Sequence, residues 1–162
     1  EKRKITSLYL DTINYDLFQI SKASDIEKFK LRYRQYNDSS DIYEEIKFSK
    51  ASGKSKEKKV TRYKNLNEIS NKIYKNFNLI PCIFISYERE YYHHYDSRIT
   101  IDKNISFRSS VKRTKSEVKY LFIPNVIEFK LNIKNKEIEK YLPKNPIAFS
   151  KFTTGIEKLY KI

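Results

Sequence analysis

The sequence predicts an α+β domain in which most residues belong to an antiparallel sheet. The chain of 162 residues has only 2 Gly and 4 Pro but 14 Tyr and 10 Phe, which favours regular strands over loops or disorder. Several segments also alternate polar and apolar side chains, the pattern of a strand with two different faces. Stretches with helical spacing are few. The length predicts one domain spanning 1–162.

The charge of the chain points to an anionic partner. Lys and Arg number 34 against 20 Asp and Glu, a formal net charge of +14, and this self-repulsion must be offset either by solvent or by an acidic partner, of which a polyanionic ligand is the natural candidate. The single Cys82 excludes an internal disulfide and a thiolate metal cluster. No stretch approaches the roughly 20 apolar residues of a membrane span, and no signal peptide is visible. We therefore expect a cytoplasmic domain, with tethering to a membrane through a larger parent protein left open.

The first half of the chain predicts a hairpin of charged strands. Ile5–Leu10 has the β-branched and aromatic residues of a strand and ends in turn-forming residues. Phe29–Tyr36 alternates strictly, so that Lys30, Arg32 and Arg34 share one face. After a turn cluster at 37–40, Ile42–Ser49 alternates again. These two alternating segments predict an antiparallel pair with one cationic face.

The middle of the chain predicts a loop and a helix. Lys50–Lys59 is rich in lysine and small polar residues, which is typical of an exposed, mobile loop. A short strand is expected at Val60–Tyr63. Apolar residues then recur with helical spacing from Leu66 to Phe77, with Asn65 as the N-cap. We expect the clearest helix of the chain here.

The second half of the chain predicts further strands and two short helices. Strands are expected at Cys82–Glu90, Arg98–Asp102 and Val126–Leu131. Helical spacing appears near Glu137–Leu142 and Ile156–Tyr160.

Two sheet geometries explain the charged strand faces. In an open antiparallel sheet the charged face is exposed to solvent, and the alternating pattern alone favours this geometry. In a closed barrel the charged faces line a lumen. Lysines and arginines converging in such a lumen repel one another unless an anion neutralises them. The residues alone leave both geometries open.

Six short strings, in order along the chain, are more specific than the alternation. The chain resembles the polyphosphate-polymerase domain of the vacuolar transporter chaperone (VTC) family, in the triphosphate tunnel metalloenzyme (CYTH-like) superfamily. The strings that carry the resemblance are Ser7–Thr12, Lys30-x-Arg32-x-Arg34, Glu45-x-Lys47, Tyr87-x-Arg89 followed by Arg98–Asp102, Val126–Lys130, and Phe149–Phe152 with Gly155.

The resemblance implies a closed antiparallel β-barrel, the triphosphate tunnel, with helices packed outside. It also implies an N-terminally truncated domain, because the family has an earlier strand than any found here, and the missing element is a first strand or helix. Site residues carry over only where the strings match. The implied catalytic residues are Arg32, Arg34, Lys47, Arg89 and Arg98; the implied phosphate contacts are Lys30, Lys59, Arg62, Lys130 and Lys151; and the implied ligand of Mn²⁺ or Mg²⁺ is Glu128.

The function implied by the resemblance is polyphosphate synthesis. ATP would donate its γ-phosphate to a growing inorganic polyphosphate chain inside the tunnel, with a divalent metal. Two other functions stay open, an inorganic triphosphatase of the same superfamily and a non-catalytic module that binds polyphosphate. ATP and polyphosphate or triphosphate are the expected partners, and nucleic acid is not expected.

Overall fold

The computed structural model describes residues 1–23, 27–37, 39–94, 97–110, 120–130 and 142–162. Nine strands form one sheet: β1 Lys2–Asp11, β2 Lys28–Tyr36, β3 Ile42–Lys50, β4 Gly53–Val60, β5 Lys72–Tyr74, β6 Phe77–His94, β7 Ser97–Ser109, β8 Tyr120–Ile123 and β9 Val126–Lys130. The helices are α1 Asp16–Lys22, the 3₁₀ turn η1 Leu66–Glu68, and α4 Lys151–Tyr160.

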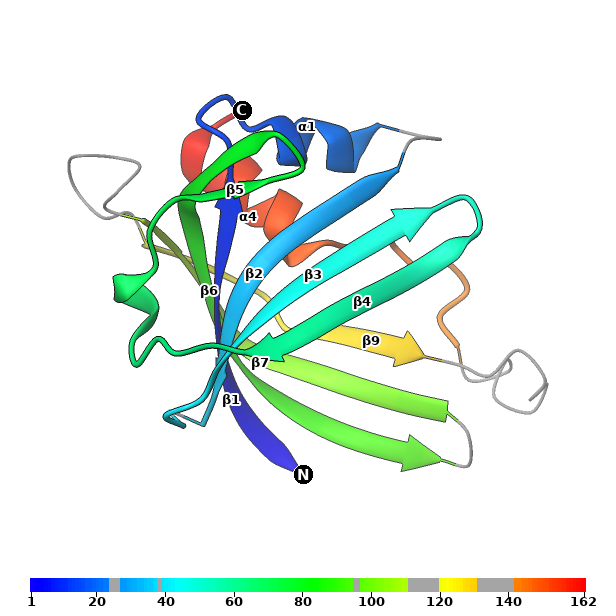
Figure 1. Ribbon diagram of the computed structural model, residues 1–162. Helices are drawn as coiled ribbons and strands as arrows, with labels where there is room; N and C mark the ends of the chain where they lie inside the picture. The colour runs from blue at the N-terminus through cyan, green and yellow to red at the C-terminus, as the bar shows by residue number, and fades with distance from the viewer. Residues whose placement is uncertain (24–26, 38, 95–96, 111–119, 131–141) are drawn as a thin grey trace.

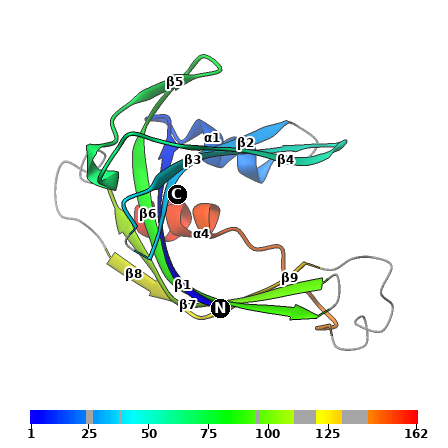
Figure 2. The ribbon, with the colours of Figure 1, turned by 60° about the horizontal axis from the view of Figure 1, so that its bottom comes forward.

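The sheet is antiparallel and curls into a trough. Its order is β4-β3-β2-β1-β6-β7-β8, with β5 added to β6 and β9 added to β7. Figure 1 shows the strands crossing with a strong twist, and Figure 2 shows the curl from the side. Within the described ranges no pairing joins β4 to β8 or β9. The predicted α+β class and tunnel-like antiparallel sheet are confirmed, although the sheet does not close into a barrel.

The convex face of the trough carries one apolar core. Strand alternation turns Leu31 of β2 and Ile46 of β3 to this side, away from the charged residues beside them in sequence. Leu17 of α1 and Leu66 and Ile69 at η1 complete the cluster. This packing explains why the short η1 segment is held against the sheet.

The concave face carries a second core, which α4 covers. Phe152 and Ile156 of α4 pack with Ile83 and Phe107 of the sheet, and Figure 2 shows α4 inside the curve of the strands. The expectation that the helices lie outside the sheet therefore does not hold for α4. The physical reason is that this end of the concave face is apolar and must be buried. Ser150 caps the helix, since its side chain accepts a hydrogen bond from the Thr153 N–H.

Two expectations for residues 50–63 are wrong. Lys50–Lys59 does not form a loop: from Gly53 it is the edge strand β4, which pairs with β3 through Lys47↔Lys56 and Glu44↔Lys59. Lysine side chains on an edge strand hinder its pairing with strands of other molecules, so the lysine-rich sequence of β4 suits its place at the edge of the sheet. The strand expected at Val60–Tyr63 is also absent, because Val60 ends β4 and residues 61–63 have no strand assignment.

The helix expected after Asn65 is also wrong. Asn65 does cap η1, accepting a hydrogen bond from the Asn67 N–H, but the helix ends after one turn. The chain then forms the β5–β6 hairpin, in which Lys75 and Asn76 both have positive φ, 46° and 65°. Positive φ at both central residues is the conformation of a type I′ two-residue hairpin turn. Ile73, which completed the helical spacing, is 79% exposed.

Most other expected elements lie where predicted and are longer, and β9, Val126–Lys130, matches the strand expected at Val126–Leu131 as far as the described residues reach. Ile5–Leu10 lies within β1, Cys82–Glu90 within β6 and Arg98–Asp102 within β7, and α4 includes Ile156–Tyr160. The prediction at Glu137–Leu142 falls, except for Leu142, outside the described residues. Strand β8, Tyr120–Ile123, was not predicted from the sequence. Among the described helices none is long and apolar enough to cross a membrane.

Helix α1 was not predicted from the sequence, and a buried carboxylate positions its start. Asp11, at the end of β1, is fully buried. It accepts hydrogen bonds from the backbone N–H groups of Leu17 and Phe18 at 2.8 and 3.0 Å. Helix N–H groups without an intrahelical partner are satisfied in this way.

Candidate functional site

The part of the concave face that α4 leaves open is a cavity of about 1310 Å³, which we call the channel. Alternation on each strand directs charged side chains into it. Acidic residues are scarce in its lining, where the described carboxylates are Glu1 and Glu128. The cationic residues that line the channel are Arg3, Lys30, Arg32, Arg34, Lys47, Lys54, Lys56, Arg89, Arg98, Lys130 and Lys151.

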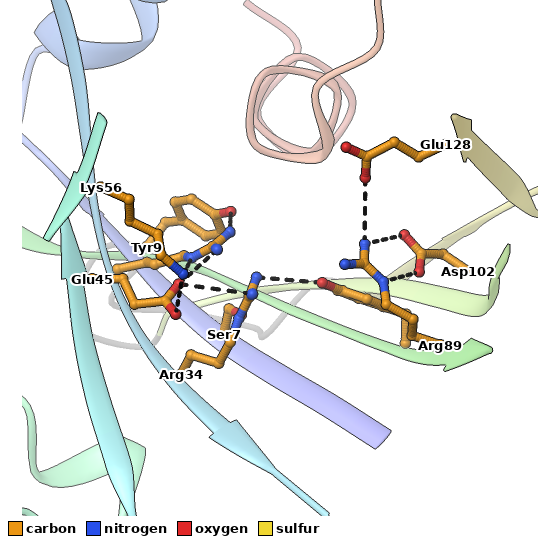
Figure 3. Close-up of polar contacts among 10 residues, drawn as sticks. Ser7, Tyr9, Arg34, Glu45, Lys56, Arg89, Asp102 and Glu128 are labelled. Atoms are coloured by element: carbon orange, nitrogen blue, oxygen red, sulfur yellow. Dashed lines mark hydrogen bonds and ion pairs between the residues drawn. The ribbon is translucent and has the colours of Figure 1, made fainter. Parts of the chain in front are cut away.

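Glu45 of β3 anchors one group of these cations. Its side chain is 1% exposed and accepts from Arg32 Nε at 2.8 Å and Arg32 Nη2 at 2.6 Å. Lys56 lies 3.3 Å away and Arg34 3.7 Å away. Burial would raise the pKa of Glu45, but Arg32 and Arg34 outweigh burial and lower it to about 2. Figure 3 shows this ionised carboxylate between the cations that it holds.

Hydroxyl groups fix the remaining donors of the two arginines. Arg32 Nη1 donates to the Tyr9 hydroxyl at 2.6 Å. Arg34 donates through Nε to Ser7 at 3.0 Å and through Nη2 to the Tyr87 hydroxyl at 3.3 Å. Burial raises the pKa of Tyr9, but Arg32 and Arg34 together lower it to about 8. Both guanidinium groups are therefore held in fixed orientations before any ligand arrives.

Asp102 of β7 anchors a second group. It is fully buried and binds Arg89 through two hydrogen bonds, at 2.6 and 2.8 Å. Lys151, the first residue of α4, also pairs with Asp102. Burial opposes ionisation, but Arg89 and Lys151 keep the pKa of Asp102 below its usual value. Figure 3 shows this group opposite the Glu45 group, with Arg34 reaching between them.

Other channel cations have no carboxylate partner in the part of the chain that the structure describes. These are Lys30, Lys47, Lys54 and Arg98. Desolvation, Lys54 and Arg32 together lower the pKa of Lys47. Desolvation, Lys47 and Arg32 likewise lower the pKa of Lys30, although Tyr9 opposes them, and Lys30 donates to the Ser150 hydroxyl at 2.9 Å. Burial is the main cause of these lowered pKa values and neighbouring positive charge adds to it, and an anion would relieve that added repulsion.

Glu128 is the carboxylate most available to a metal. Its side chain is 43% exposed and lies 3.7 Å from both Arg89 and Lys130, whereas Glu45 and Asp102 are occupied by close cations. Among the described residues no three His, Cys, Asp or Glu side chains cluster as metal ligands. Mg²⁺ in phosphate sites is commonly held by one or two carboxylates with phosphate oxygens and water. Glu128 fits that role.

The structure brings most of the predicted site residues together. Those that line the channel are Lys30, Arg32, Arg34, Lys47, Arg89, Arg98, Glu128, Lys130 and Lys151. Lys59 and Arg62 do not: they line a smaller pocket with Tyr33 and Glu44. Sequence reasoning missed Lys54 and Lys56, whose period-two spacing was the available signal, and it assigned no role to Glu45, Asp102 or Tyr9.

Comparison with known proteins agrees with this geometry. The family model described as VTC domain matches residues 1–65 and 54–160. No curated protein matches the chain. A Bacillus halodurans crystal structure, named as a candidate adenylate cyclase, is similar in fold with a TM-score of 0.57 at 14% identity, over 98% of this chain and 83% of that chain. The PH1819 protein from Pyrococcus horikoshii OT3 aligns with a TM-score of 0.43 at 12% identity, over 99% and 75%.

The family match spans nearly all of the chain, and the likeness to the Bacillus halodurans structure supports the same tunnel-like antiparallel fold. The chain belongs to the VTC domain family.

Proposed function

We propose that the chain is a polyphosphate polymerase, which transfers the γ-phosphate of ATP to a growing inorganic polyphosphate chain in the channel. The observation that carries this proposal is the convergence of cations from β2, β3, β4, β6, β7, β9 and α4 on one cavity. Four of these cations, Lys30, Lys47, Lys54 and Arg98, have no carboxylate partner within the described ranges. A cavity with this charge suits a ligand with many phosphate groups.

The reaction requires positioning and charge neutralisation more than covalent chemistry by the protein. An oxygen of the terminal chain phosphate attacks the γ-phosphorus of ATP, a new P–O–P bridge forms, the β–γ bridge breaks, and ADP leaves. Arg32, Arg34 and Arg89 are already oriented by their partners. Guanidinium groups pair with two phosphate oxygens at once and stay charged at any working pH. Lys47 and Arg98 are available to bind the incoming phosphates.

A divalent ion completes the proposed site. Glu128 would hold Mn²⁺ or Mg²⁺ beside the nucleotide, and the bound ion would neutralise part of the negative charge on the phosphates. The neighbouring Arg89 and Lys130 reach Glu128 only at 3.7 Å, so neither contact is strong enough to exclude an ion.

The test is to incubate the protein with ATP and Mn²⁺ and to detect a phosphate polymer on a gel. Glu128→Ala and Lys47→Ala should abolish or strongly reduce the polymer. Glu57→Ala and Lys64→Ala remove the same charges from exposed positions outside the channel and should not.

Two results would contradict the polymerase. Release of orthophosphate from tripolyphosphate without chain growth would make the protein a triphosphatase. Saturable tripolyphosphate binding without any turnover would make it a binding module.

A further inference from the structure

The pocket that contains Lys59 and Arg62 is separate from the channel. It has a volume of about 340 Å³, and we call it the outer pocket. Arg32, Glu45 and Lys58 lie on the channel side of the sheet. Tyr33, Glu44 and Lys59 are their neighbours in sequence, so their side chains point to the opposite side. The outer pocket therefore opens on the convex side of β2–β4, with residues 60–63 and 70–72 forming its rim.

The outer pocket is positively charged. Its described lining has three cationic side chains, Lys59, Arg62 and Lys72, and one carboxylate, Glu44, which leaves a net charge of +2. Glu44 is buried and already neutralised: Lys59 lies 3.1 Å away, Lys72 also pairs with it, and the Tyr33 hydroxyl donates to it at 2.6 Å. Burial raises the pKa of Glu44, but the hydrogen bonds from Lys72, Tyr33 and Lys59 have the larger combined effect. The pKa of Glu44 is therefore below its usual value. Glu44 thus stays ionised and holds both ammonium groups at the pocket.

Arg62 and Thr61 add donors that lack partners. Arg62 is exposed, and no carboxylate within the described ranges pairs with it. The Oγ1 atom of Thr61 is buried and has no hydrogen-bond partner among the described residues. Buried hydroxyl groups are nearly always hydrogen-bonded, so this one would gain from a ligand oxygen reaching it. Ser70 and Asn71 contribute further polar atoms to the lining.

We propose that the outer pocket is a second anion site, which binds a short inorganic phosphate such as pyrophosphate. Its volume lies at the lower end of the ~300–1,000 Å³ range of small-molecule sites, which suits one or two phosphate groups. The Arg62 guanidinium can pair with two oxygens of one phosphate, and Lys59 and Lys72 can reach the other side of the anion. This site does not depend on the reaction proposed for the channel.

The experiment measures pyrophosphate binding by calorimetry in a protein whose channel is weakened. Lys47→Gln with Arg98→Gln provides this background. Adding Lys59→Gln and Arg62→Gln should weaken the remaining binding at least about tenfold, because the anion loses two charged hydrogen-bond donors. Adding Lys64→Gln and Lys158→Gln removes the same charge from exposed positions outside both cavities and should have little effect. Circular dichroism confirms that each variant folds.

A second measurement locates the bound anion. In the background protein, pyrophosphate should shift the NMR ring signals of Tyr33 and Tyr63, which line the outer pocket, and should leave those of Tyr9 unchanged. The proposal is overturned if the background protein shows no saturable binding. It is also overturned if the two pairs of added substitutions weaken binding equally, because general charge attraction would then account for it. Polymer synthesis is not measured, so failure here is distinct from failure of the proposed reaction.

Discussion

At Glu45 a single carboxylate lies against cationic side chains from both neighbouring strands, Arg32 and Arg34 of β2 and Lys56 of β4. Glu45→Gln would leave these buried or half-buried cations without their counter-charge. Breaking a buried ion pair from one side costs about 3–5 kcal/mol, so we expect a loss in the free energy of unfolding of about 3 kcal/mol in phosphate-free buffer. Tripolyphosphate should restore part of this loss. Urea unfolding with and without tripolyphosphate measures both effects.

The pH dependence of the Glu45 effect has a defined sign. Because the pKa is lowered from 4.5 to about 2 in the folded protein, the stabilisation is fully present above pH 4.5 and is lost as the pH falls towards 2. The difference between the parent protein and Glu45→Gln should therefore shrink across this range. A difference that stayed constant would show that Glu45 acts through packing.

Tyr9 gives the channel a titrating group near neutral pH. Its hydroxyl faces Arg32, with Arg34 and Lys30 close by, and its pKa is lowered to about 8. Above that pH the phenolate adds a negative charge that competes with phosphate. We expect tripolyphosphate affinity to fall more steeply between pH 7.5 and 9 in the parent protein than in Tyr9→Phe. Parallel pH profiles of the two proteins would rule out a role for Tyr9.

At the scale of one element, α4 depends on a glycine for its position. A Cβ at Gly155 would lie 2.6 Å from Ile83 Cδ1 and 2.7 Å from Phe107 Cδ1. Phe107 is fully buried, so Gly155→Ala forces the helix or the ring to move. Overpacking of this kind costs about 1–3 kcal/mol, which outweighs the gain in helix propensity. Thermal unfolding should show a lowered Tm, whereas Lys158→Ala on the exposed side of α4 should change little.

The elements that the sequence predicted are those with a buried and a polar face. In β2 the alternation is visible because one face packs in a core and the other lines the channel. All residues of β4 are exposed, so no apolar residue alternates with its lysines. Its strand conformation comes from pairing with β3, which no local pattern reveals. The β5–β6 hairpin depends on positive φ at Lys75 and Asn76, and Lys75 is not a typical turn residue at that conformation.

The positions of the predicted site residues could be foreseen only where their strand was recognised. Lys30, Arg32 and Arg34 were placed on one face because their strand was recognised. Lys59 was assigned to phosphate binding while its segment was expected to be a loop. The side of the sheet towards which its side chain points could therefore not be predicted. Once β4 is paired, Lys58 lies opposite Glu45 and Lys59 must face the other side of the sheet.

At the scale of the whole molecule, the net charge of +14 should make stability depend on polyanions. A ligand that binds only the folded state at 100 times its Kd adds about 2.7 kcal/mol. We expect tripolyphosphate to raise Tm accordingly, and sodium sulfate at equal ionic strength to raise it less. Lys47→Gln with Arg98→Gln should remove most of the difference. If sulfate and tripolyphosphate act equally, the stabilisation is general screening.

The carboxylates Glu45 and Asp102 also act as counterions that the protein supplies to itself. Arg32, Lys56, Arg89 and Lys151 each have a carboxylate of the protein close by, so they attract few anions from the buffer. An incoming polyphosphate then releases fewer small ions than the number of lining cations would suggest. The logarithm of its association constant should fall with the logarithm of salt concentration along a shallow line. Replacing Glu45 by Gln should make that line steeper.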